Sequence, residues 1–399
     1  MFKSTLLKAA IFAPLLETTA FLGSIFILVP FFPLIFLRPK LWRFCADQLV
    51  AMWLTLPPAL LEFLYGIQYF VSGDRILYDQ PALILMNHRT RLDWLFFWSV
   101  LYKMDPRLLT TEKISLKKEL KWVPGAGWAM ECDSFIFLDR NWEADKKVLD
   151  DTIQYYANSN RNYQILLFPE GTDKCPRATQ RSNNYADKMG LPRYEHVLHP
   201  RTTGFTYLAK SMKRAGYLKY IYAVTMGYAD RTIQSELEMA TKGPPMYVHC
   251  QIQRFDVSGL PIDNEAEMET WLRDLWAQKE QRLQRFHAEP DPLKRHFAPD
   301  KTQLFWPVTP TGVQRLGLMF SVAFWLCTAS MWMYFFCTMT PTLYYIVFAI
   351  GVFVYLGLVH GGVERFVIHR FTSDQRNAIT KWNSTDVGSN HNNNELKVE

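Results

Sequence analysis

The feature that most restricts the fold is a long stretch near the carboxyl end without any charged side chain. Residues 316–363 contain no Asp, Glu, Lys or Arg. A bilayer-spanning helix needs roughly 20 apolar residues, so this stretch is long enough for two. Pro341 predicts a break between helices near 316–338 and 343–360. Basic residues flank the stretch on both sides, and the positive-inside rule therefore predicts that both flanks face the cytoplasm.

The amino end contains a second apolar region. Residues 18–37 carry no charge and are long enough to span a bilayer, although Pro30 and Pro33 would kink a helix there. The stretch is too long for a typical cleaved signal peptide and lacks an obvious cleavage site, which favours a retained anchor. Residues 48–73 begin with an uncharged run, 48–61, whose length favours the membrane interface over a full crossing. A buried amphipathic helix of the globular part is the alternative.

Between these ends, the pattern of apolar runs predicts an α/β globular domain. Short runs typical of buried strands alternate with longer stretches of helical periodicity. A long helix is predicted over 262–287, with an apolar stripe that would pack on the core. The expected strands are 82–86, 135–138, 164–168, 221–225 and 246–252. The expected domains are an amino-terminal membrane anchor with an interfacial segment (1–74), the globular domain (75–300), a carboxyl-terminal transmembrane hairpin (301–370) and a polar cytosolic tail (371–399).

The distribution of charge and cysteine indicates an anionic ligand rather than a metal. Residues 174–214 hold nine Lys or Arg and two Asp or Glu, although the net charge of the whole chain is only +6. Such an excess attracts phosphates on a soluble ligand or a lipid surface; a solvated basic face is the alternative. No nucleic-acid-binding motif accompanies it, so no nucleic acid partner is expected. The six cysteines form no C-x-x-C pair and no H-E-x-x-H motif occurs, so we expect neither a metal site nor a disulfide framework.

A candidate catalytic pair follows the strand expected at 82–86. His88 comes two residues after that strand, and Asp93 follows five residues later. Imidazole exchanges protons near neutral pH and a neighbouring carboxylate can hold its tautomer, so the pair could act as a general base. Each residue also has a simpler explanation, because His88 could be a core histidine and Asp93 could complete a capping box that begins at Thr90. A reactive histidine in the loop before a helix is compatible with such a cap.

Two further loops follow expected strands. The five residues Phe-Pro-Glu-Gly-Thr at 168–172 end one strand, and the glycine lets the backbone approach a ligand closely. Because the basic segment follows directly, this turn is predicted to form the base of a phosphate-binding site. Arg140 follows the strand at 135–138, and its planar guanidinium suits phosphate oxygens unless it pairs with the neighbouring Asp139.

Together these motifs resemble those of the glycerolipid (1-acylglycerol-3-phosphate) acyltransferase family. That family carries an N-H-x-x-x-x-D block, an apolar block that ends in arginine, and an F-P-E-G-T block, and the three occur here in the same order. Residues 87–94 and 197–205 look most like the lysocardiolipin acyltransferase branch. The family's fourth block, usually an apolar strand with proline, corresponds here to 222–227, which lacks proline.

The resemblance implies a glycerolipid-acyltransferase-like α/β domain, with a mixed sheet and surrounding helices, flanked by amino- and carboxyl-terminal transmembrane helices. It implies transfer of a fatty acyl group from acyl-CoA, a co-substrate, to the free hydroxyl of an anionic lysophospholipid such as lysocardiolipin, lysophosphatidylinositol or lysophosphatidylglycerol. No cofactor and no metal are expected. His88 and Asp93 would form the general base. The expected substrate-binding residues are Asn87, Arg140, Glu170, Gly171 and Thr172.

The implied setting is the endoplasmic reticulum membrane, with a multi-pass chain whose catalytic domain faces the cytosol. The lipid bilayer is thus an expected partner, and the sequence leaves the oligomeric state open. Two alternatives to this function stay open, namely acylation of lysophosphatidic acid to phosphatidic acid and a non-catalytic membrane scaffold that retains the fold. A serine hydrolase is disfavoured because no G-x-S-x-G motif occurs.

Overall fold

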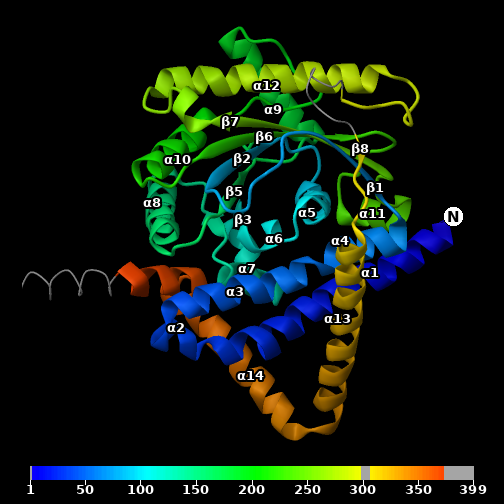
Figure 1. Cartoon of the computed structure of the whole chain (residues 1–399), viewed down its shortest axis with the longest axis vertical. Coiled ribbons are helices and arrows are strands. Elements are labelled where there is room, and N and C mark those ends of the chain that lie inside the picture. The colour runs from blue at the N-terminus through cyan, green and yellow to red at the C-terminus, as the bar shows by residue number, and fades with distance from the viewer. Residues whose placement is uncertain (1, 298–305, 373–399) are drawn as a thin grey trace, which may run out of the picture.

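An eight-stranded sheet forms the centre of the protein (Figure 1). The structure is a computed structural model and describes residues 2–297 and 306–372. The strand order across the sheet is β4-β3-β5-β2-β6-β7-β1-β8. The strands are β1 (Gln68–Gly73), β2 (Ala82–Met86), β3 (Glu112–Lys117), β4 (Ile136–Leu138), β5 (Gln164–Leu167), β6 (Tyr220–Tyr228), β7 (Tyr247–Asp256) and β8 (Trp306–Pro307).

Five neighbouring strands of this sheet are parallel. β4, β3, β5, β2 and β6 run in one direction, whereas β7 is antiparallel to β6, β1 is parallel to β7, and β8 is antiparallel to β1. All five residues of β2 are buried, as expected for a central parallel strand with neighbours on both sides and helices over both faces. The prediction of an α/β domain with a mixed sheet is confirmed.

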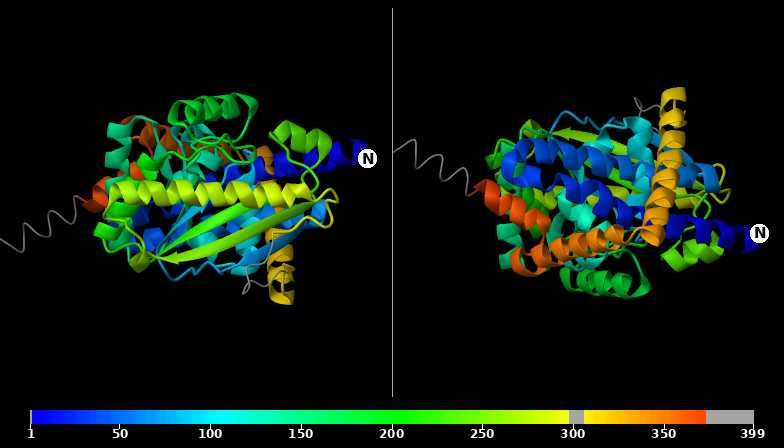
Figure 2. Two further views of the ribbon diagram at one scale, coloured as in Figure 1. Left: turned by 90° about the horizontal axis from the view of Figure 1, so that it is seen from above. Right: turned by 90° about the horizontal axis from the view of Figure 1, so that it is seen from below.

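Helices cover both faces of the sheet. Figures 1 and 2 show α12 lying along one face, whereas α5 and α6 lie on the other, between the sheet and the apolar helices. The helices of the globular part are α5 (Asp93–Met104), α6 (Leu108–Thr111), α7 (Ala126–Cys132), α8 (Trp142–Asn158), α9 (Pro176–Met189), α10 (Thr202–Arg214), α11 (Glu236–Lys242) and α12 (Glu265–Ala288). The long helix predicted over 262–287 is therefore confirmed as α12, and its apolar stripe is buried as expected.

All five expected strands are present, but three strands were missed: β1, β3 and the two-residue β8. β3 escaped the sequence analysis because it begins with the charged residues Glu112 and Lys113, which are nevertheless buried, and has only two apolar residues, Ile114 and Leu116. β1 was placed with 48–73 at the membrane interface, and that interpretation is wrong for 68–73. These residues pair with β7 along the whole strand and so belong to the sheet, which extends before residue 75.

Among the described residues, four helical segments are long and apolar enough to cross a membrane: Thr5–Leu37, Pro39–Tyr65, Gly312–Thr338 and Thr340–His360. The first runs through α1 (Phe2–Gly23), two short helical turns (Ser24–Leu28 and Val29–Phe31) and α2 (Pro33–Leu37). The second runs through α3 (Pro39–Leu54), α4 (Leu56–Leu60) and a last turn (Leu61–Tyr65). The third is α13 (Gly312–Thr338), and the fourth is α14 (Thr340–Tyr355) with a final turn (Leu356–His360).

The two pairs of apolar helices lie differently with respect to the globular part. Figures 1 and 2 show α1 to α3 along its underside, whereas α13 and α14 extend away from it as a hairpin. In the most apolar windows of the first pair, 50% and 61% of the residues are buried inside the protein, against 28% and 22% in the hairpin. The hairpin predicted at the carboxyl end is thus present, with its break at Met339. The tail expected from 371 lies outside the described residues from 373 onward.

A buried network of charges joins α3 to the sheet. Arg43 and Asp47, one helical turn apart on α3, form an ion pair of 2.8 Å between Nη2 and Oδ1. Lys113 of β3 reaches Asp47 at 3.0 Å and Asp133 at 2.7 Å. All four side chains are at most 2% exposed. Since removal of one partner would leave a buried charge unpaired, the network fixes this helix to the globular part.

The carboxyl-terminal hairpin is attached at both of its ends. At its start, the Tyr102 hydroxyl donates to the carbonyl of Gln314 at 2.7 Å. At its end, Lys121 pairs with Glu364, and Glu131 accepts a hydrogen bond from the Val363 N–H at 2.9 Å. These contacts close the hairpin onto α5 and α7, so the membrane segments and the sheet form one connected structure.

Candidate active site

The predicted site residues meet at one edge of the sheet. Parallel strands bring their carboxyl ends together, and loops at that edge commonly hold ligands in open α/β sheets. His88 follows β2, Arg140 follows β4, and Glu170 follows β5. Tyr228, the last residue of β6, lies at the same edge. The topology thus brings together side chains that are up to about 140 residues apart in the sequence.

His88 and Asp93 are in direct contact. Nδ1 of the imidazole lies 3.0 Å from Oδ2 of the carboxylate. The Asp93 side chain is fully buried, whereas 16% of the His88 side chain is exposed. The imidazole also stacks on the ring of Phe168, with 4.1 Å between the ring centroids. Because an ionised carboxylate can only accept a hydrogen bond, this contact puts the proton on Nδ1 and leaves Nε2 free to take another.

The loop between β2 and α5 differs in detail from the predicted capping box. The helix begins at Asp93 rather than near Thr90, and no side chain caps its first turn. The Asp93 carboxylate instead turns back to accept the N–H of Thr90 at 3.0 Å, while the Thr90 hydroxyl accepts the N–H of Leu92 at 3.1 Å. The same carboxylate therefore shapes the loop and holds His88.

Tyr228 completes the surroundings of Asp93, and sequence reasoning missed it. Its hydroxyl donates to Oδ1 of Asp93, the oxygen that does not face His88. Burial raises the pKa of Tyr228 well above its usual value, with the charge of Asp93 adding to the effect. The phenol therefore stays protonated and serves as a permanent donor. The expected strand ended at residue 225, three residues before Tyr228, so no direct signal in the sequence pointed to this residue.

Glu170 joins three parts of the site from a buried position. Its Oε1 accepts the N–H of His88 and the indole N–H of Trp276, both at 3.2 Å, and its Oε2 accepts the N–H of Leu198 at 3.1 Å. The side chain is 3% exposed. Burial raises the pKa of Glu170 to about 7, partly offset by these hydrogen bonds and by His88. Its carboxylate thus organises the loops around His88 and faces no open space.

Asn87 also has its hydrogen-bonding groups occupied within the protein. Its amide nitrogen donates to the carbonyl of Met226 at 3.1 Å, and its amide oxygen accepts the N–H of the same residue at 2.8 Å. The side chain is 1% exposed. Asn87 thus ties the end of β2 to β6 and fixes the chain just before His88, and its predicted role in substrate binding stays a prediction.

Arg140 and Gly171 lie together on the exposed side of the site. Arg140 has a left-handed backbone with φ of 62°, and its Nη2 donates to the carbonyl of Gly171 at 3.2 Å. Gly171 has φ of 72°, and a Cβ added there would lie 3.2 Å from Nε of Arg201. Two exposed guanidinium groups therefore flank this glycine. The Thr172 hydroxyl donates to Asp173 at 3.4 Å.

The basic segment 174–214 contributes to the site at two points. Arg201 lies beside Gly171, and its N–H donates to the carbonyl of Pro169 at 2.8 Å. The N–H of Lys174 donates to the carbonyl of His88 at 2.8 Å. Most other basic residues of the segment lie exposed on α9 and α10. Some residues of the basic segment thus belong to the site, and the others form a solvated surface.

The helix α12 reaches the site as well as the core, which the sequence analysis did not anticipate. Trp276 bonds Glu170, and the carboxylate of Glu280 accepts N–H groups of three consecutive residues at 2.7–3.1 Å. These residues are Glu195, His196 and Val197, and the next two N–H groups go to Glu170 and to Ser182. Five consecutive amides, 195–199, are therefore held by side chains. We call residues 195–199 the clamped segment.

These contacts define what the site can do chemically. One imidazole nitrogen is held by a buried carboxylate, and the ring is partly exposed. Arg140 and Arg201, beside Gly171 at the same sheet edge, carry guanidinium groups that can bind an anion. Within the described residues, no group of three or more His, Cys, Asp or Glu is placed to hold a metal ion. The arrangement suits removal of a proton from a hydroxyl next to an anionic group.

Comparison with known proteins gives the class to which this fold and site belong. The Acyltransferase family model matches residues 68–229, and the model described as Acyltransferase C-terminus matches residues 241–310. The first match holds the motifs around His88 and Glu170, and the second holds α12.

Individual relatives cover most of the chain. Lysophosphatidylinositol acyltransferase 10 of Caenorhabditis elegans is 40% identical over 88% of this chain and 90% of its own. Lysocardiolipin acyltransferase 1 is 38% identical in Gallus gallus, over 81% of this chain and 88% of its own, and 36% identical in Mus musculus, over 90% and 93%. The solved structure of the 1-acyl-sn-glycerophosphate acyltransferase from Thermotoga maritima aligns with a TM-score of 0.42 at 15% identity, over 71% of this chain and 99% of that chain. The chain belongs to the acyltransferase family, in agreement with its motifs, and its relatives include lysophospholipid acyltransferases.

Proposed function

We propose that this protein transfers a fatty acyl group from acyl-CoA to the free hydroxyl of an anionic lysophospholipid. The observation that carries the proposal is the contact between the partly exposed His88 and the fully buried Asp93. This pair lies at the same sheet edge as Arg140 and Gly171, where an anionic head group could bind.

In the proposed reaction, His88 acts as the general base. Its Nε2 takes the proton of the acceptor hydroxyl while the hydroxyl oxygen forms a bond to the carbonyl carbon of the thioester. The bond between that carbon and sulfur then breaks, and the thiolate of CoA takes the proton back from the imidazolium. Asp93 stabilises the positive imidazole during these steps and keeps its Nδ1 protonated. The products are a diacyl phospholipid and free CoA.

The membrane segments fit substrates that carry long acyl chains. We place the site on the cytosolic face of the endoplasmic reticulum membrane, with the hairpin of α13 and α14 crossing the bilayer. Support comes from the charge-free hairpin with its basic flanks and from its low burial inside the protein.

Relatives named as lysophosphatidylinositol and lysocardiolipin acyltransferases support an anionic acceptor. The test uses membranes that contain wild-type protein or His88→Ala, a labelled acyl-CoA, and a panel of lysophospholipids that includes lysophosphatidic acid. His296→Ala, which changes an exposed histidine outside the site, is the matched control.

We expect label in an anionic phospholipid with wild type and with the control, and a loss on the order of 10²–10⁴ in rate with His88→Ala. If labelled phosphatidic acid is the main product, the acceptor is lysophosphatidic acid and the proposed acceptor is wrong. Full activity of folded His88→Ala would refute the mechanism. Absence of any product with folded wild-type protein would refute the enzyme and favour a scaffold.

A further inference from the structure

One position in the buried stripe of α12 holds a lysine. The stripe consists mainly of apolar side chains, and Lys279 stands where the helical spacing predicts another. Its side chain is fully buried. A buried ammonium is costly unless its charge is compensated, and ionisable groups in such positions are common at functional sites. The ammonium therefore indicates a role that an apolar side chain could not fill.

The ammonium of Lys279 lies where β2 and β6 approach the catalytic loops. Its Nζ donates to the carbonyl of Val224, and it lies 3.4 Å from the carbonyl oxygen of Leu85 and 3.3 Å from the hydroxyl oxygen of Thr225. Leu85 precedes His88 by three residues. These oxygens fix the ammonium at the junction of the two strands, but they are neutral and do not balance its charge.

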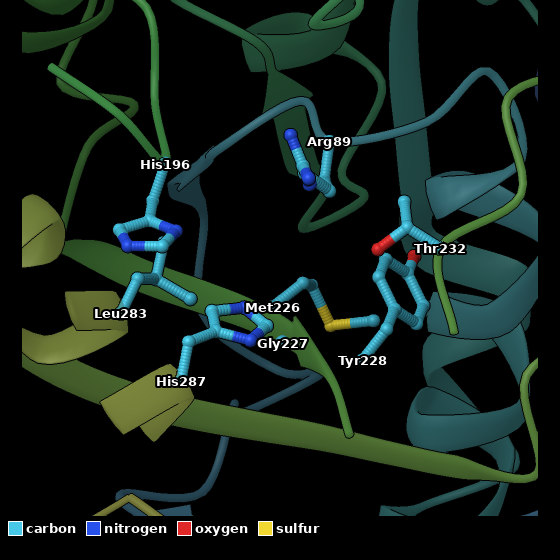
Figure 3. Close-up of a pocket in the computed structure, with 8 residues that line it drawn as sticks. All are labelled: Arg89, His196, Met226, Gly227, Tyr228, Thr232, Leu283 and His287. Carbon is cyan, nitrogen blue, oxygen red and sulfur yellow. The ribbon is translucent and has the colours of Figure 1, made fainter. Parts of the chain in front are cut away.

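The contact between α12 and β6 encloses this ammonium. Figure 3 shows one end of the contact, where Leu283 and His287 of α12 lie beside Met226 and Gly227 of β6. Leu283 follows Lys279 by about one helical turn, and both Leu283 and Met226 are buried. The ammonium is thus held away from water, where charges act on one another more strongly than in solution.

Glu170 supplies a negative charge that acts on the ammonium. The indole of Trp276 contacts both groups: its N–H donates to Oε1 of Glu170 at 3.2 Å, and Nζ of Lys279 lies over the ring at 5.1 Å from the centroid. Arg282, on the same helix, repels the ammonium. The thiol of Cys250 on β7 stays neutral, because burial raises its pKa to about 12.

Glu170 holds the site together as an ionised carboxylate. Its two oxygens accept three N–H groups, from His88, Leu198 and Trp276. A protonated carboxyl carries a hydrogen on one of its oxygens and so has less capacity to accept hydrogen bonds. Protonation of Glu170 would therefore loosen the loops that it joins, including the one that carries His88.

Glu170 and Lys279 lose their charges in the same pH range. Burial raises the pKa of Glu170 to about 7 and lowers the pKa of Lys279 to about 7. The other charged or titratable groups that act on Glu170 are His88, after β2, and Lys174, before α9. Since opposite charges favour each other's ionised form, the ammonium extends the pH range in which Glu170 is a carboxylate.

We propose that Lys279 is a positioning residue for the proposed acyl transfer: its ammonium keeps Glu170 ionised, and the ionised Glu170 holds the loops around His88. The effect on turnover rests on the proposed function, whereas the effect on Glu170 does not. This role gives the region matched by the second family model, residues 241–310, a part in the reaction.

The test replaces the ammonium by neutral, unbranched side chains. Lys279→Met removes both the charge and the donor, and Lys279→Gln removes the charge but keeps a donor. Arg285→Met, which removes an exposed charge from the same helix, is the matched control. kcat is measured with labelled acyl-CoA and lysophosphatidylinositol at saturation between pH 5.5 and pH 9, with each variant also made in a Glu170→Gln background.

The expected shift follows from the separation of the two charges on either side of the indole. At roughly 10 Å and an effective dielectric constant of about 20, loss of the ammonium should move the acid side of the kcat profile upward by about one pH unit. Both neutral variants should then fall roughly tenfold below wild type at pH 6 and nearly match it at pH 9, where Glu170 is ionised in each protein. Arg285→Met should follow wild type, and Lys279→Met should not shift the profile in the Glu170→Gln background.

Three results would overturn the inference. An equal loss of kcat at pH 6 and pH 9 would show that Lys279 serves structure alone. A shift of the profile that persists in the Glu170→Gln background would exclude the route through Glu170. A shift in Lys279→Met but not in Lys279→Gln would assign the effect to the hydrogen bonds rather than to the charge.

A stability measurement separates failure of this inference from failure of the proposed function. The difference in thermal unfolding temperature between each protein and its Glu170→Gln counterpart reports the ionisation of Glu170 and needs no turnover. The pH at which this difference changes should be about one pH unit higher for Lys279→Met than for wild type. An unchanged pH dependence would overturn the inference even if acyl transfer is established, whereas the expected shift would uphold the coupling even if no transfer is found.

Discussion

Asp93→Asn tests how the buried carboxylate acts on His88. Asp93 accepts three hydrogen bonds, from His88 and Thr90 on Oδ2 and from Tyr228 on Oδ1. An asparagine in the same place has one oxygen and one NH2 group. The oxygen should take the Oδ2 position, because the N–H of Thr90 cannot accept a hydrogen bond, whereas the Tyr228 hydroxyl can accept one from the NH2 group. His88 then keeps its tautomer and loses only the negative charge beside it.

The size of this loss follows from the distance. At 3.0 Å and an effective dielectric constant of about 20, a full charge pair is worth roughly 5–6 kcal/mol. In the transition state, about half of the positive charge would have developed on the imidazole, so Asp93 would contribute about half of this energy there. Asp93→Asn should therefore lose roughly 2.5–3 kcal/mol of transition-state stabilisation. Since each 1.36 kcal/mol is tenfold in rate, kcat should fall on the order of a hundredfold.

The assay is the transfer of labelled acyl groups at saturating substrates, with Asp187→Asn on the exposed face of α9 as the matched control. Adding Tyr228→Phe to Asp93→Asn removes the partner that orients the amide. The amide can then flip, His88 can adopt the other tautomer, and activity should fall close to that of His88→Ala. Wild-type turnover in Asp93→Asn would refute the electrostatic reasoning, and an unchanged rate on adding Tyr228→Phe would refute the reasoning about orientation.

Three further predictions concern stability and order. The pKa of Glu170 is raised from 4.5 to about 7, so the stability gained from its protonated form is complete below pH 4.5 and is lost as the pH rises through 7. Between pH 5 and pH 8, the thermal unfolding temperature of wild type should therefore fall relative to that of Glu170→Gln. Asp47→Asn leaves Arg43 and Lys113 with less compensation in a buried position and should lower the free energy of unfolding by about 3 kcal/mol, measured by chemical unfolding in detergent. Glu280→Ala removes the acceptor of three amides and should speed hydrogen exchange at 195–197.

Each of these three predictions has an outcome that would contradict it, and the last two have a control variant. Parallel pH curves for wild type and Glu170→Gln would contradict the raised pKa. Glu17→Gln, on the exposed side of α1, should leave stability within about 0.5 kcal/mol of wild type, and an equally small effect of Asp47→Asn would contradict the role of the buried network. Glu265→Ala, at the exposed start of α12, should not change exchange in the clamped segment.

The sequence predicted the parts of the site that depend on local pattern. His88, Arg140 and Glu170 each follow a short apolar strand, and parallel strands place their carboxyl ends at one edge. Tyr228, Trp276 and Glu280 were missed because their roles depend on contacts with residues more than 80 positions away. Such contacts leave no trace in local spacing, since a buried aromatic or charged residue on a helix is read as part of its apolar stripe.

β1 was misassigned for a related physical reason. Residues 61–65, next to it, end a helical segment with the length and apolarity of a membrane span, and the strand itself is only six residues long. The apolar runs on either side of Gly66 are read as one segment unless that glycine is taken as the helix end. Gly66, with φ of 71°, is the residue at which the chain leaves the helix, and its left-handed backbone is typical of a helix end.

The pairing of β1 with β7 sets the order in which the enzyme can be completed during synthesis. Gln68 pairs with Tyr247, so the first strand to leave the ribosome waits for about 180 further residues before its neighbour exists. Trp276 and Glu280, which hold Glu170 and the clamped segment, are made later still. A growing chain that already contains His88 and Asp93 therefore has an open sheet and an unanchored loop. A chain that ends before α12 would hold His88 and Asp93 without the side chains that fix Glu170 and the clamped segment.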